Sequence, residues 1–524
     1  MSRIDKIIIV GGGSSGWMSA SMLIKAFPNK EIIVIDSDKR APIGVGESTY
    51  DGILHFCKYL EIDMKDFFKH TDASIKLAIQ FSKFYNNKSD DRFIYPFGGS
   101  DISNTLWGLQ DWFIKKNLDK NLPVSDFAES YFPSAHLVKH NRFSENLDGS
   151  LGNFDSQNFI ALHFDALKFA NWLKERYAIK RGVKVLTHDV DHIEKDKNGI
   201  KFLTLSNGDN ISADLYIDCT GFSSLLIEKT LQEPFLDHTD VLPNNRAWAT
   251  QIDYLDKETE LTGVTDCTAL KNGWVWNIPL WSRIGTGYVY SDKYTSPEDA
   301  LKEFKEHLMS DNVLIKRNHD YLDSIEYKDI KIKSGIHERI WVDNVVAIGL
   351  SAGFIEPLES NGLFTVHEFL FELVRSMSRE TTSQWEKDVF NVRTREIFND
   401  FVEFIRMHYS LSIREDSDYW KDNYNRKYNL EKINTTSHIK NTLDAKTKTF
   451  IPPYRGGLSW IATGMNYLFL DDISIKMGEI SNRMDYKNDL AEYLNNLEIK
   501  KGIWESAALN SPSMYQYLKE KYYE

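Results

Sequence analysis

Glycines and one acidic residue near the start of the chain have the spacing of a dinucleotide-binding turn. The apolar run 7–10 precedes a G-x-G-x-x-G sequence at 11–16, a helix-forming run follows at 17–27, and a second apolar run, 32–35, ends at Asp36. In such turns the glycines allow a tight bend and close approach of the backbone to a pyrophosphate, while the acid accepts hydrogen bonds from ribose hydroxyls. A glycine-rich loop without a nucleotide is the alternative. The spacing favours a nucleotide site formed by Gly11, Gly13, Ser14, Ser15, Gly16 and Asp36.

Two later segments indicate which dinucleotide is bound. The apolar strand 213–217 ends in Asp218 and leads to Gly221, and the strand 344–348 runs into small residues at Gly349 and Leu350. Three separated glycine turns suit an elongated flavin, because both ends of that molecule must be held. We therefore expect FAD, with Asp218, Gly221, Gly349 and Leu350 among its contacts.

A helix is predicted to begin at Asn361 and Gly362. The apolar residues that follow fall on one helical stripe: Leu363, Val366, Phe369, Leu370, Leu373 and Val374. The free amides and the positive dipole end of a helix start favour an anion. Asn361 and Gly362 are therefore candidate anion-binding residues.

Several sequence strings resemble the flavin-dependent tryptophan-halogenase family. They are GGGSSGWM at 11–18, IGVGEST at 43–49, Lys76 within IKLAIQF, and GWVWNIP at 273–279. The similarity continues through EPLES at 356–360 and the His-Tyr pair at 408–409, so it covers most of the first 420 residues. The Trp-x-Trp-x-Ile-Pro string is the most specific, because general flavin monooxygenases share the glycine turn but lack this string and the lysine.

The resemblance implies an FAD-dependent halogenase. In this family reduced FAD, O2 and halide give hypohalous acid, which is relayed to a lysine beside an electron-rich aromatic substrate, and a glutamate assists. The matching residues are Lys76 and Glu359, with Glu356 as a competing candidate. The family's halide contacts correspond to the amides of Asn361 and Gly362. Further expected contacts are Val45, Gly46, Glu47, Ser48 and Gly362 for FAD, and Ser360, Trp274 and Trp276 for substrate or tunnel.

The surroundings of Lys76 support a catalytic role over the alternative of a solvated surface lysine. Read as one strand, 74–81 places Ile75, Leu77, Ile79 and Phe81 on one face and Ser74, Lys76, Ala78 and Gln80 on the other. The second face is small and polar, as expected of a cavity wall. A desolvated lysine there would have a lowered pKa and be a better nucleophile.

Departures from the family pattern bear on the substrate and the halide. The segment 450–460 has no obvious acid for the ammonium of free tryptophan, and Tyr95, Phe97, Trp107 and Trp112 form a candidate aromatic pocket. We therefore expect an indole or phenol as substrate. The chain reads Glu-Ser-Asn-Gly at 359–362 where the family usually reads Glu-Ser-Thr-Gly. We therefore expect bromide or iodide to be used at least as well as chloride.

Other polar residues are expected to be structural. Arg414, Asp416 and Trp420 resemble family framework residues with a salt bridge, and His163 and Asp165 are expected to fix the sheet near the cofactor. The 14 histidines show no ligand spacing, so no metal site is expected.

The predicted fold is α/β: a Rossmann-like FAD-binding module of the flavin monooxygenase type, an inserted substrate module and a mainly helical C-terminal region. The expected ranges are 1–90, 155–235 and 330–380 for FAD, 91–154 and 236–329 for substrate, and 381–524 for the helical region. Within the last, Ile473, Met477, Ile480 and Met484 form an amphipathic stripe that would pack on the body or form a dimer seam in a homo-oligomer.

Composition limits the possible partners. The 524 residues are 42% apolar and 27% charged with a net charge of −13, which disfavours nucleic-acid and anionic-membrane binding. Three scattered cysteines and the lack of a targeting segment suggest the cytoplasm. The one dinucleotide fingerprint is assigned to FAD, so none is left to bind NAD(P)H. A separate flavin reductase is therefore the expected partner. Two functions are the alternatives: a flavin-dependent aromatic hydroxylase and a catalytically idle FAD-binding scaffold. Neither would need Lys76.

Overall fold

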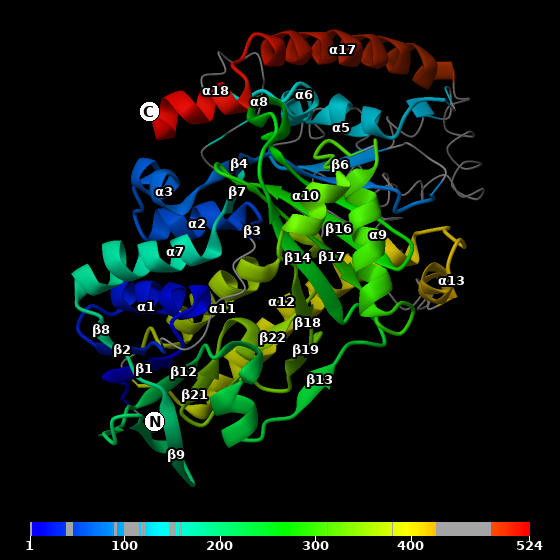
Figure 1. Cartoon of the computed structure of the whole chain (residues 1–524). Helices are drawn as coiled ribbons and strands as arrows, with labels where there is room; N and C mark the ends of the chain where they lie inside the picture. The colour runs from blue at the N-terminus through cyan, green and yellow to red at the C-terminus, as the bar shows by residue number, and fades with distance from the viewer. Residues whose placement is uncertain are drawn as a thin grey trace. The chain divides into compact units, whose positions relative to one another are not determined.

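The computed structural model describes residues 3–37, 46–87, 92–98, 115–116, 119, 121–145, 154, 156, 160–311, 313–379, 381–425 and 484–524 (Figure 1). The chain divides into two compact units. Unit 1 comprises Met1–Ala73, Phe164–Asn245 and Lys331–Val402. Unit 2 comprises Ser74–His163, Arg246–Ile330 and Glu403–Glu524. Relative to the expected modules, residues 74–90 and most of the C-terminal region fall in unit 2.

Unit 1 is built on a six-stranded sheet with β1 near its middle. The strand order is β20 (Trp341–Val342), β21 (Val345–Ala347), β12 (Leu215–Asp218), β1 (Lys6–Val10), β2 (Glu31–Ile35) and β8 (Lys184–Leu186). All neighbours are parallel except β20 and β21. The apolar runs of β1, β2 and β12 are buried, as expected for strands covered on both faces. The Rossmann-like fold class predicted from the sequence is confirmed.

Helices and small sheets complete unit 1. Its helices are α1 (Ser14–Ala26), α2 (Gly52–Tyr59), α3 (Met64–Thr71), α7 (Ala166–Trp172) and α11 (Gly362–Ser376). Three-stranded sheets are formed by β9 (Val190–Asp196), β10 (Gly199–Leu205) and β11 (Asn210–Ile211), and by β13 (Phe235–Asp237), β19 (Gly335–His337) and β22 (Gly353–Phe354). Helix α1 packs against α11, α7 and β2. This packing fixes the helix that follows the glycine turn.

Unit 2 is built on a seven-stranded, mainly antiparallel sheet. The order is β18 (Lys328–Lys331), β14 (Arg246–Ile252), β17 (Ile284–Tyr290), β16 (Gly273–Pro279), β15 (Val264–Ala269), β5 (Ala78–Ser82) and β6 (Arg92–Pro96), with β15 and β5 parallel. Helices α9 (Pro297–Met309) and α10 (His319–Ser324) cover part of one face through a core that includes Val275, Tyr288 and Phe304. Strand β4 (Ser74–Lys76) pairs instead with β7 (Ala161–Phe164).

The remaining helices of the described chain include α5 (Ser125–Tyr131), α6 (Pro133–Lys139), α8 (Lys257–Glu260), α12 (Gln384–Ser410), α13 (Asp418–Asn425), α17 (Met484–Leu509) and α18 (Met514–Leu518). The C-terminal region is thus helical where it is described. The predicted stripe at Ile473, Met477 and Ile480 lies outside the described residues. Downstream, Tyr515 and Tyr523 stack on Trp281, with ring centroids 5.6 and 4.0 Å away.

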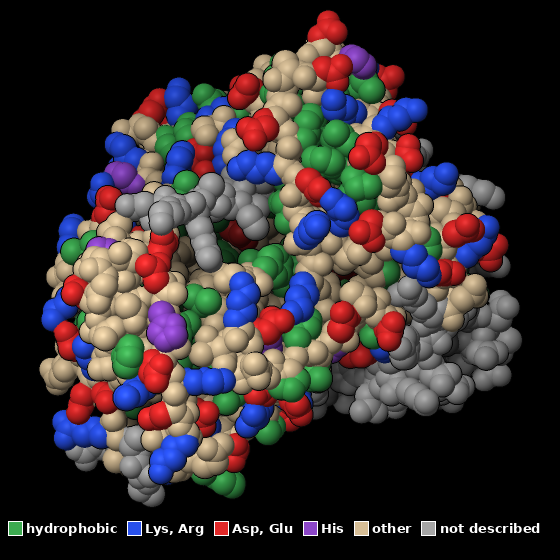
Figure 2. All heavy atoms as spheres, turned by 60° about the horizontal axis from the view of Figure 1, so that its bottom comes forward, with side chains coloured by type: hydrophobic (Ala, Val, Ile, Leu, Met, Phe, Trp, Pro, Cys, Tyr) green, Lys and Arg blue, Asp and Glu red, His purple; other side chains and the backbone are tan. Residues whose placement is uncertain are grey.

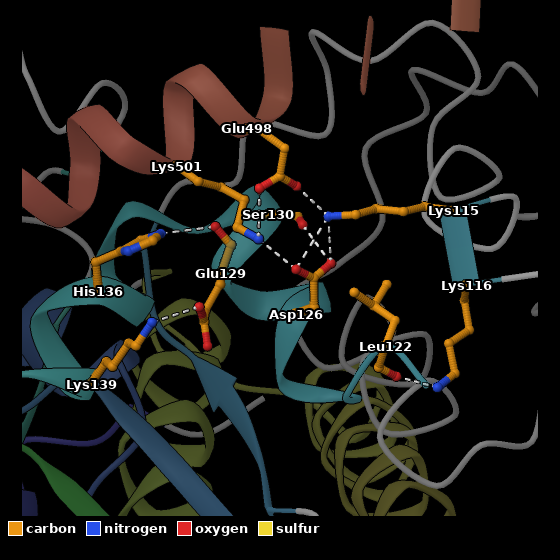
Figure 3. Close-up of polar contacts among 10 residues, drawn as sticks. All are labelled: Lys115, Lys116, Leu122, Asp126, Glu129, Ser130, His136, Lys139, Glu498 and Lys501. Atoms are coloured by element: carbon orange, nitrogen blue, oxygen red, sulfur yellow. Dashed lines mark hydrogen bonds and ion pairs between the residues drawn. The ribbon is translucent and has the colours of Figure 1, made fainter. Parts of the chain in front are cut away.

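A buried acid holds helix α17 to helix α5. Asp126 of α5 accepts hydrogen bonds from Ser130 and from Lys115, at 3.0 Å each, and from Lys501 of α17 (Figure 3). Burial alone would raise the pKa of Asp126, but hydrogen bonds and charge from Lys501 and Lys115 bring that pKa below its usual value. Glu498 of α17 also pairs with Lys115 and Lys501, at 2.5 and 3.6 Å, so two acids and two lysines join the helices.

The surface shows no concentration of one charge on the face drawn in Figure 2, where Lys and Arg side chains alternate with Asp and Glu. Within the described ranges, no helix is both long enough and apolar enough to span a bilayer.

Candidate active site

The glycine turn between β1 and α1 has the geometry that its sequence predicts. Gly11 has a φ of +111°, and a Cβ there would lie 2.3 Å from the carbonyl oxygen of Cys219. A Cβ on Gly16 would lie 1.9 Å from the carbonyl oxygen of Gly11. By contrast, a Cβ on Gly13 would point into open space at the start of α1, which has no side-chain cap. The turn therefore leaves room and helix-start amides for a pyrophosphate, so these residues fit a dinucleotide.

Asp36 lies beside this turn, directly after β2. A Cβ on Gly12 would come within 1.9 Å of an Asp36 carboxylate oxygen. The carboxylate also pairs with the ammonium of Lys174 at 2.9 Å. Sequence reasoning missed Lys174, because nothing in its local sequence marks it as a partner of a residue 138 positions earlier. The carboxylate of Asp36 therefore lies beside the glycine turn, with its orientation fixed by a lysine.

The second and third glycine turns lie near the first. Asp218 accepts hydrogen bonds from the amide and hydroxyl of Thr220 and from the amides of Leu226 and Ile227, at 2.7–3.1 Å. Its carboxylate therefore shapes the Gly221 loop. Gly349 has a φ of +72°, and a Cβ on it would lie 2.7 Å from the Cβ of Ser15. The structure therefore brings the Gly349 and Leu350 turn to the start of α1.

Helix α11 begins where the periodicity predicts. The 3₁₀ turn Pro357–Glu359 leads through Ser360, in a left-handed conformation with φ +59°, to Asn361 and Gly362. The Ser360 hydroxyl is 2.9 Å from the hydroxyl of Ser48. Asn361 is buried and does not cap the helix with its side chain. The free amides of this helix start remain the candidate anion site.

Glu47 is an acid beside that anion site. A Cβ on Gly362 would lie 3.8 Å from Oε2 of Glu47. Burial raises the pKa of Glu47 to about 7. The sequence places Glu47 among flavin contacts but gives no sign that it adjoins Gly362, 315 residues later. The charge near the helix start therefore changes within the neutral pH range. Val45, predicted beside it, lies outside the described residues, and Gly46 has a φ of +106°.

The two candidate glutamates are both fully buried in unit 1. Glu356 accepts a hydrogen bond from Asn244, with Nδ2 and Oε2 2.6 Å apart. Glu359 ends the 3₁₀ turn two residues before the candidate anion site. Both glutamates therefore remain candidates for the assisting acid.

Lys76 is fully buried in unit 2, at the end of β4. Its ammonium lies 5.0 Å from the ring centroid of Phe97, within cation–π range. Burial, and then the charge of Lys76, hold the pKa of His163 well below its usual value. His163 also lies 2.8 Å from the hydroxyl of Thr265. The lysine is therefore buried beside an aromatic ring, with a neutral imidazole nearby.

The prediction of one continuous strand over residues 74–81 is wrong. It is interrupted at Leu77, whose amide donates to the carbonyl of Gly263 and whose carbonyl accepts from Phe97, both at 2.7 Å. Strand β4 therefore joins β7, while β5 enters the seven-stranded sheet. The alternation alone could not show this, because side-chain direction is unchanged by a switch of partner strand.

Trp274 and Trp276 lie on one face of β16, as expected, with ring centroids 6.1 Å apart. Both are buried. A Cβ on Gly287 of the neighbouring strand would lie 2.2 Å from the Trp276 ring, so a glycine is required there. Tyr95 and Phe97 are buried with ring centroids 5.9 Å apart. Trp107 and Trp112 lie outside the described residues.

The residues expected to be structural make framework contacts. Arg414 pairs with both oxygens of Asp416 at 2.9 and 2.8 Å and lies over the ring of Trp420. Asp165 caps α7 by accepting from two of its amides. In the part of the chain that the structure describes, no group of His, Cys, Asp or Glu could hold a metal ion.

Comparison with known proteins decides the family. The family model for tryptophan halogenase matches residues 6–451. The chain is 33% identical over 443 residues to the 7-chloro-L-tryptophan 6-halogenase KtzR of Kutzneria sp. (strain 744), an alignment covering 80% of this chain and 82% of that protein. The chain belongs to the tryptophan halogenase family.

Solved structures agree with this membership. The apo structure of VirX1 has a TM-score of 0.88 and 34% identity, and the match covers all of both chains. BrvH, a flavin-dependent halogenase from Brevundimonas sp. BAL3, has a TM-score of 0.81 and 27% identity over 99% of each chain. The protein is therefore a flavin-dependent halogenase, and the resemblance inferred from its motifs is confirmed.

The residues that the sequence predicts for the site of this tryptophan halogenase occur in both units, which are described separately. Unit 1 brings together the glycine turns and, around the start of α11, Glu47, Ser48, Ser360 and Gly362. Unit 2 holds Lys76 with Phe97, and the tryptophan pair. Lys174 and Gly287 are the supporting residues that sequence reasoning missed.

Proposed function

We propose that this halogenase uses Lys76 to deliver an electrophilic halogen from hypohalous acid to an electron-rich arene of the indole or phenol type. The observation that carries the proposal is the complete burial of Lys76 beside the Phe97 ring. A surface lysine would be solvated and would hold hypohalous acid no better than buffer amines do. A buried lysine is shielded from water and held in one place, so it can keep the electrophile beside the substrate.

The flavin would be held by unit 1. The start of α1 and Gly13 would receive the pyrophosphate, Asp36 the ribose, and the Gly221 and Gly349 turns other parts of the molecule. Reduced FAD with O2 supplies the oxidising power that converts halide to hypohalous acid. Because one dinucleotide fingerprint is present, we propose that a separate flavin reductase supplies the reduced cofactor.

The halide would bind at the amides of Asn361 and Gly362. The helix dipole favours an anion there, and the absence of a side-chain cap on α11 leaves the amides available. This local positive potential offsets the overall negative charge of the chain. Glu359, two residues earlier and buried, would assist by hydrogen bonding to the electrophile or by stabilising the cationic arene intermediate.

Halide binding is expected to strengthen as the pH falls through 7. Glu47 lies beside Gly362 and has a pKa of about 7, so it is mainly anionic at pH 8 and mainly neutral at pH 6. Repulsion of about 1.4 kcal/mol in the anionic form would raise the KM for halide about fivefold between pH 6 and pH 8. Steady-state halogenation at varied bromide and pH measures this.

The Glu47→Gln variant is expected to have a halide KM that no longer changes over this range. Glu61→Gln, which alters an exposed acid of the same unit, serves as the control and should keep the wild-type profile. Identical pH profiles for wild type and Glu47→Gln would contradict the assignment.

The substrate and halide are tested by one panel. Purified protein, a flavin reductase, FAD and equimolar chloride, bromide and iodide are incubated with tryptophan, indole or a phenol. Products are identified in mass spectrometry by the mass of the added halogen, and chlorinated and brominated products also by isotope pattern. We expect indole or phenol to be turned over faster than tryptophan, and bromide or iodide to be used at least as well as chloride.

Other results of the panel have defined meanings. Turnover of tryptophan far above that of indole would contradict the substrate proposal, and exclusive chlorination would contradict the halide proposal. An oxygenated product formed without halide would indicate hydroxylation. Reduced flavin left unused with every arene and halide would indicate a scaffold protein.

A further inference from the structure

A chain of three hydrogen bonds within unit 2 connects the strand of Lys76 to the strand of the tryptophan pair. The hydroxyl of Thr265 in β15 lies 2.8 Å from Nε2 of His163 in β7. Nδ1 of His163 lies 3.3 Å from the hydroxyl oxygen of Ser74 in β4. Ser74 in turn donates to the carbonyl oxygen of Pro279, the last residue of β16. All of these residues are buried, so the chain satisfies polar groups that would otherwise be costly to bury.

The direction of the hydrogen bonds follows from the serine. Because the Ser74 hydroxyl gives its hydrogen to Pro279, its oxygen can only accept from the ring, and Nδ1 of His163 carries the hydrogen. The ring is neutral, since burial, and then the charge of Lys76, hold the pKa of His163 well below its usual value. Nε2 therefore carries no hydrogen and accepts from the Thr265 hydroxyl. Both ring nitrogens are occupied, so His163 does not itself take a proton from a substrate.

His163 and Lys76 lie on one face of the β4–β7 pair. Ser74 is directly opposite His163, and Lys76 is directly opposite Ala161. Lys76 and His163 are therefore diagonal neighbours on the same face. Such neighbours are roughly 7–8 Å apart, within reach of a long side chain. The effect of the Lys76 charge on the pKa of His163 agrees with this closeness.

Strand β4 gives the lysine little backbone support of its own. The strand has three residues, and among the described strands it pairs with β7 alone. The chain leaves it at Leu77, directly after Lys76. A pairing this short opens easily at its ends. The side chain of Ser74 adds a bond to β16 two residues before the lysine, and His163 holds that side chain in place.

We propose that His163 is a positioning residue for Lys76. Its ring holds Ser74, and with it the lysine strand, in a fixed place between β15 and β16. This role rests on the proposed function of Lys76 in delivering the halogen. A lysine fixed in this way meets the arene at one distance and from one direction, which decides the carbon that is halogenated. A displacement of about 1 Å in such a group lowers a rate by up to about 10²-fold.

The His163→Phe variant keeps a ring of similar size and removes both hydrogen bonds. In the full chain with a flavin reductase, FAD and bromide, we expect brominated product per reduced flavin consumed to fall about 10- to 100-fold. Oxidation of reduced flavin should continue at the wild-type rate. This is measured with phenol, or with indole if indole is the faster arene of the panel.

The ratio of brominated isomers separates positioning from stability. Phenol gives ortho and para products and indole gives products at several ring carbons, and liquid chromatography with mass spectrometry counts each isomer. A displaced lysine presents the halogen to more than one carbon, so we expect the ratio to change in His163→Phe. A loss of folded protein lowers all isomers together and leaves their ratio as it is in the wild type.

A set of threonine variants tests the hydrogen-bond chain without changing the ring, and it decides the matter if His163→Phe does not fold. Thr265→Val keeps the shape of the side chain and removes the donor to Nε2. We expect a roughly threefold to tenfold loss of product per flavin with a changed isomer ratio. Thr265→Ser keeps the hydroxyl and should give wild-type values. Thr250→Val is the control, because Thr250 is also buried in this sheet and donates to the carbonyl of Glu326. It should keep the wild-type isomer ratio.

A failure of this role is distinguishable from a failure of the lysine relay. Wild-type product and isomer ratio in folded His163→Phe, or the same isomer ratio in Thr265→Val and Thr250→Val, would overturn the positioning role while leaving the relay intact. Full halogenation by Lys76→Met would overturn the relay and the positioning role together.

Discussion

Replacing Lys76 by methionine is expected to abolish halogenation while reduced flavin continues to be oxidised. Methionine is an unbranched side chain one heavy atom shorter than lysine and carries no amine, so the variant removes the reactive group and nearly preserves the shape of the buried site. Loss of a positioned group that activates or orients the electrophile should lower the halogenation rate roughly 10²- to 10⁴-fold. The rate is measured as halogenated product per reduced flavin consumed, so that coupling and flavin oxidation are read separately.

The stability of this variant distinguishes a lost function from a lost fold. Chemical denaturation of Lys76→Met measures the free energy of unfolding, and a cooperative transition with bound FAD retained shows that a loss of halogenation is not a loss of the fold. Lys302→Met, at an exposed lysine of α9, is the matched control and should halogenate as the wild type does. Full halogenation by Lys76→Met would end the proposed relay.

Alanine substitutions in the glycine turn are expected to affect stability and FAD binding differently at Gly11 and at Gly13. In Gly11→Ala the Cβ would lie 2.3 Å from the Cys219 carbonyl oxygen, and the φ of +111° would be strained. We expect the free energy of unfolding to fall by about 2–5 kcal/mol and FAD binding to be lost. Chemical denaturation and fluorescence titration with FAD measure the two quantities.

Gly13→Ala should separate nucleotide binding from folding. Its Cβ meets open space, so the unfolding free energy should change by less than about 1 kcal/mol. The same methyl would occupy space proposed for the pyrophosphate, so FAD binding should weaken severely. Gly182→Ala, with a φ of +99° and no atoms nearby, reports the backbone strain alone. FAD affinity of Gly13→Ala equal to the wild type would place the pyrophosphate elsewhere.

Local sequence predicted those parts of the site whose chemistry depends on neighbours in the chain. The turn at 11–16 and the start of α11 follow from apolar periodicity and glycine spacing, and both are where the sequence placed them. The proposed halide site is different, because Glu47 and Gly362 are 315 residues apart and the local sequence around one gives no sign that the other lies nearby. The same reason explains why Lys174 was not predicted beside Asp36.

Strand pairing is the other feature that the local sequence could not predict. Alternation along 74–81 shows which side chains share a face, but not which strand supplies the hydrogen bonds. The amide and carbonyl of Leu77 both bond outside β4 and β7, so the chain changes sheets at that residue. Lys76 is placed by this change, because it is the last residue of β4.

The strand order of unit 1 also has a consequence during synthesis. Strand β1 lies between β2 and β12, and Ile7 pairs with Leu215, so half of its hydrogen bonds wait for a segment roughly 200 residues later. At ribosomal speeds of about 5–20 residues per second, the apolar edge of the β1–β2 pair stays exposed for roughly 10–40 s. During that interval the nascent chain presents an unpaired hydrophobic strand, so yield in cells should depend on chaperones that cover such edges and on the rate of translation.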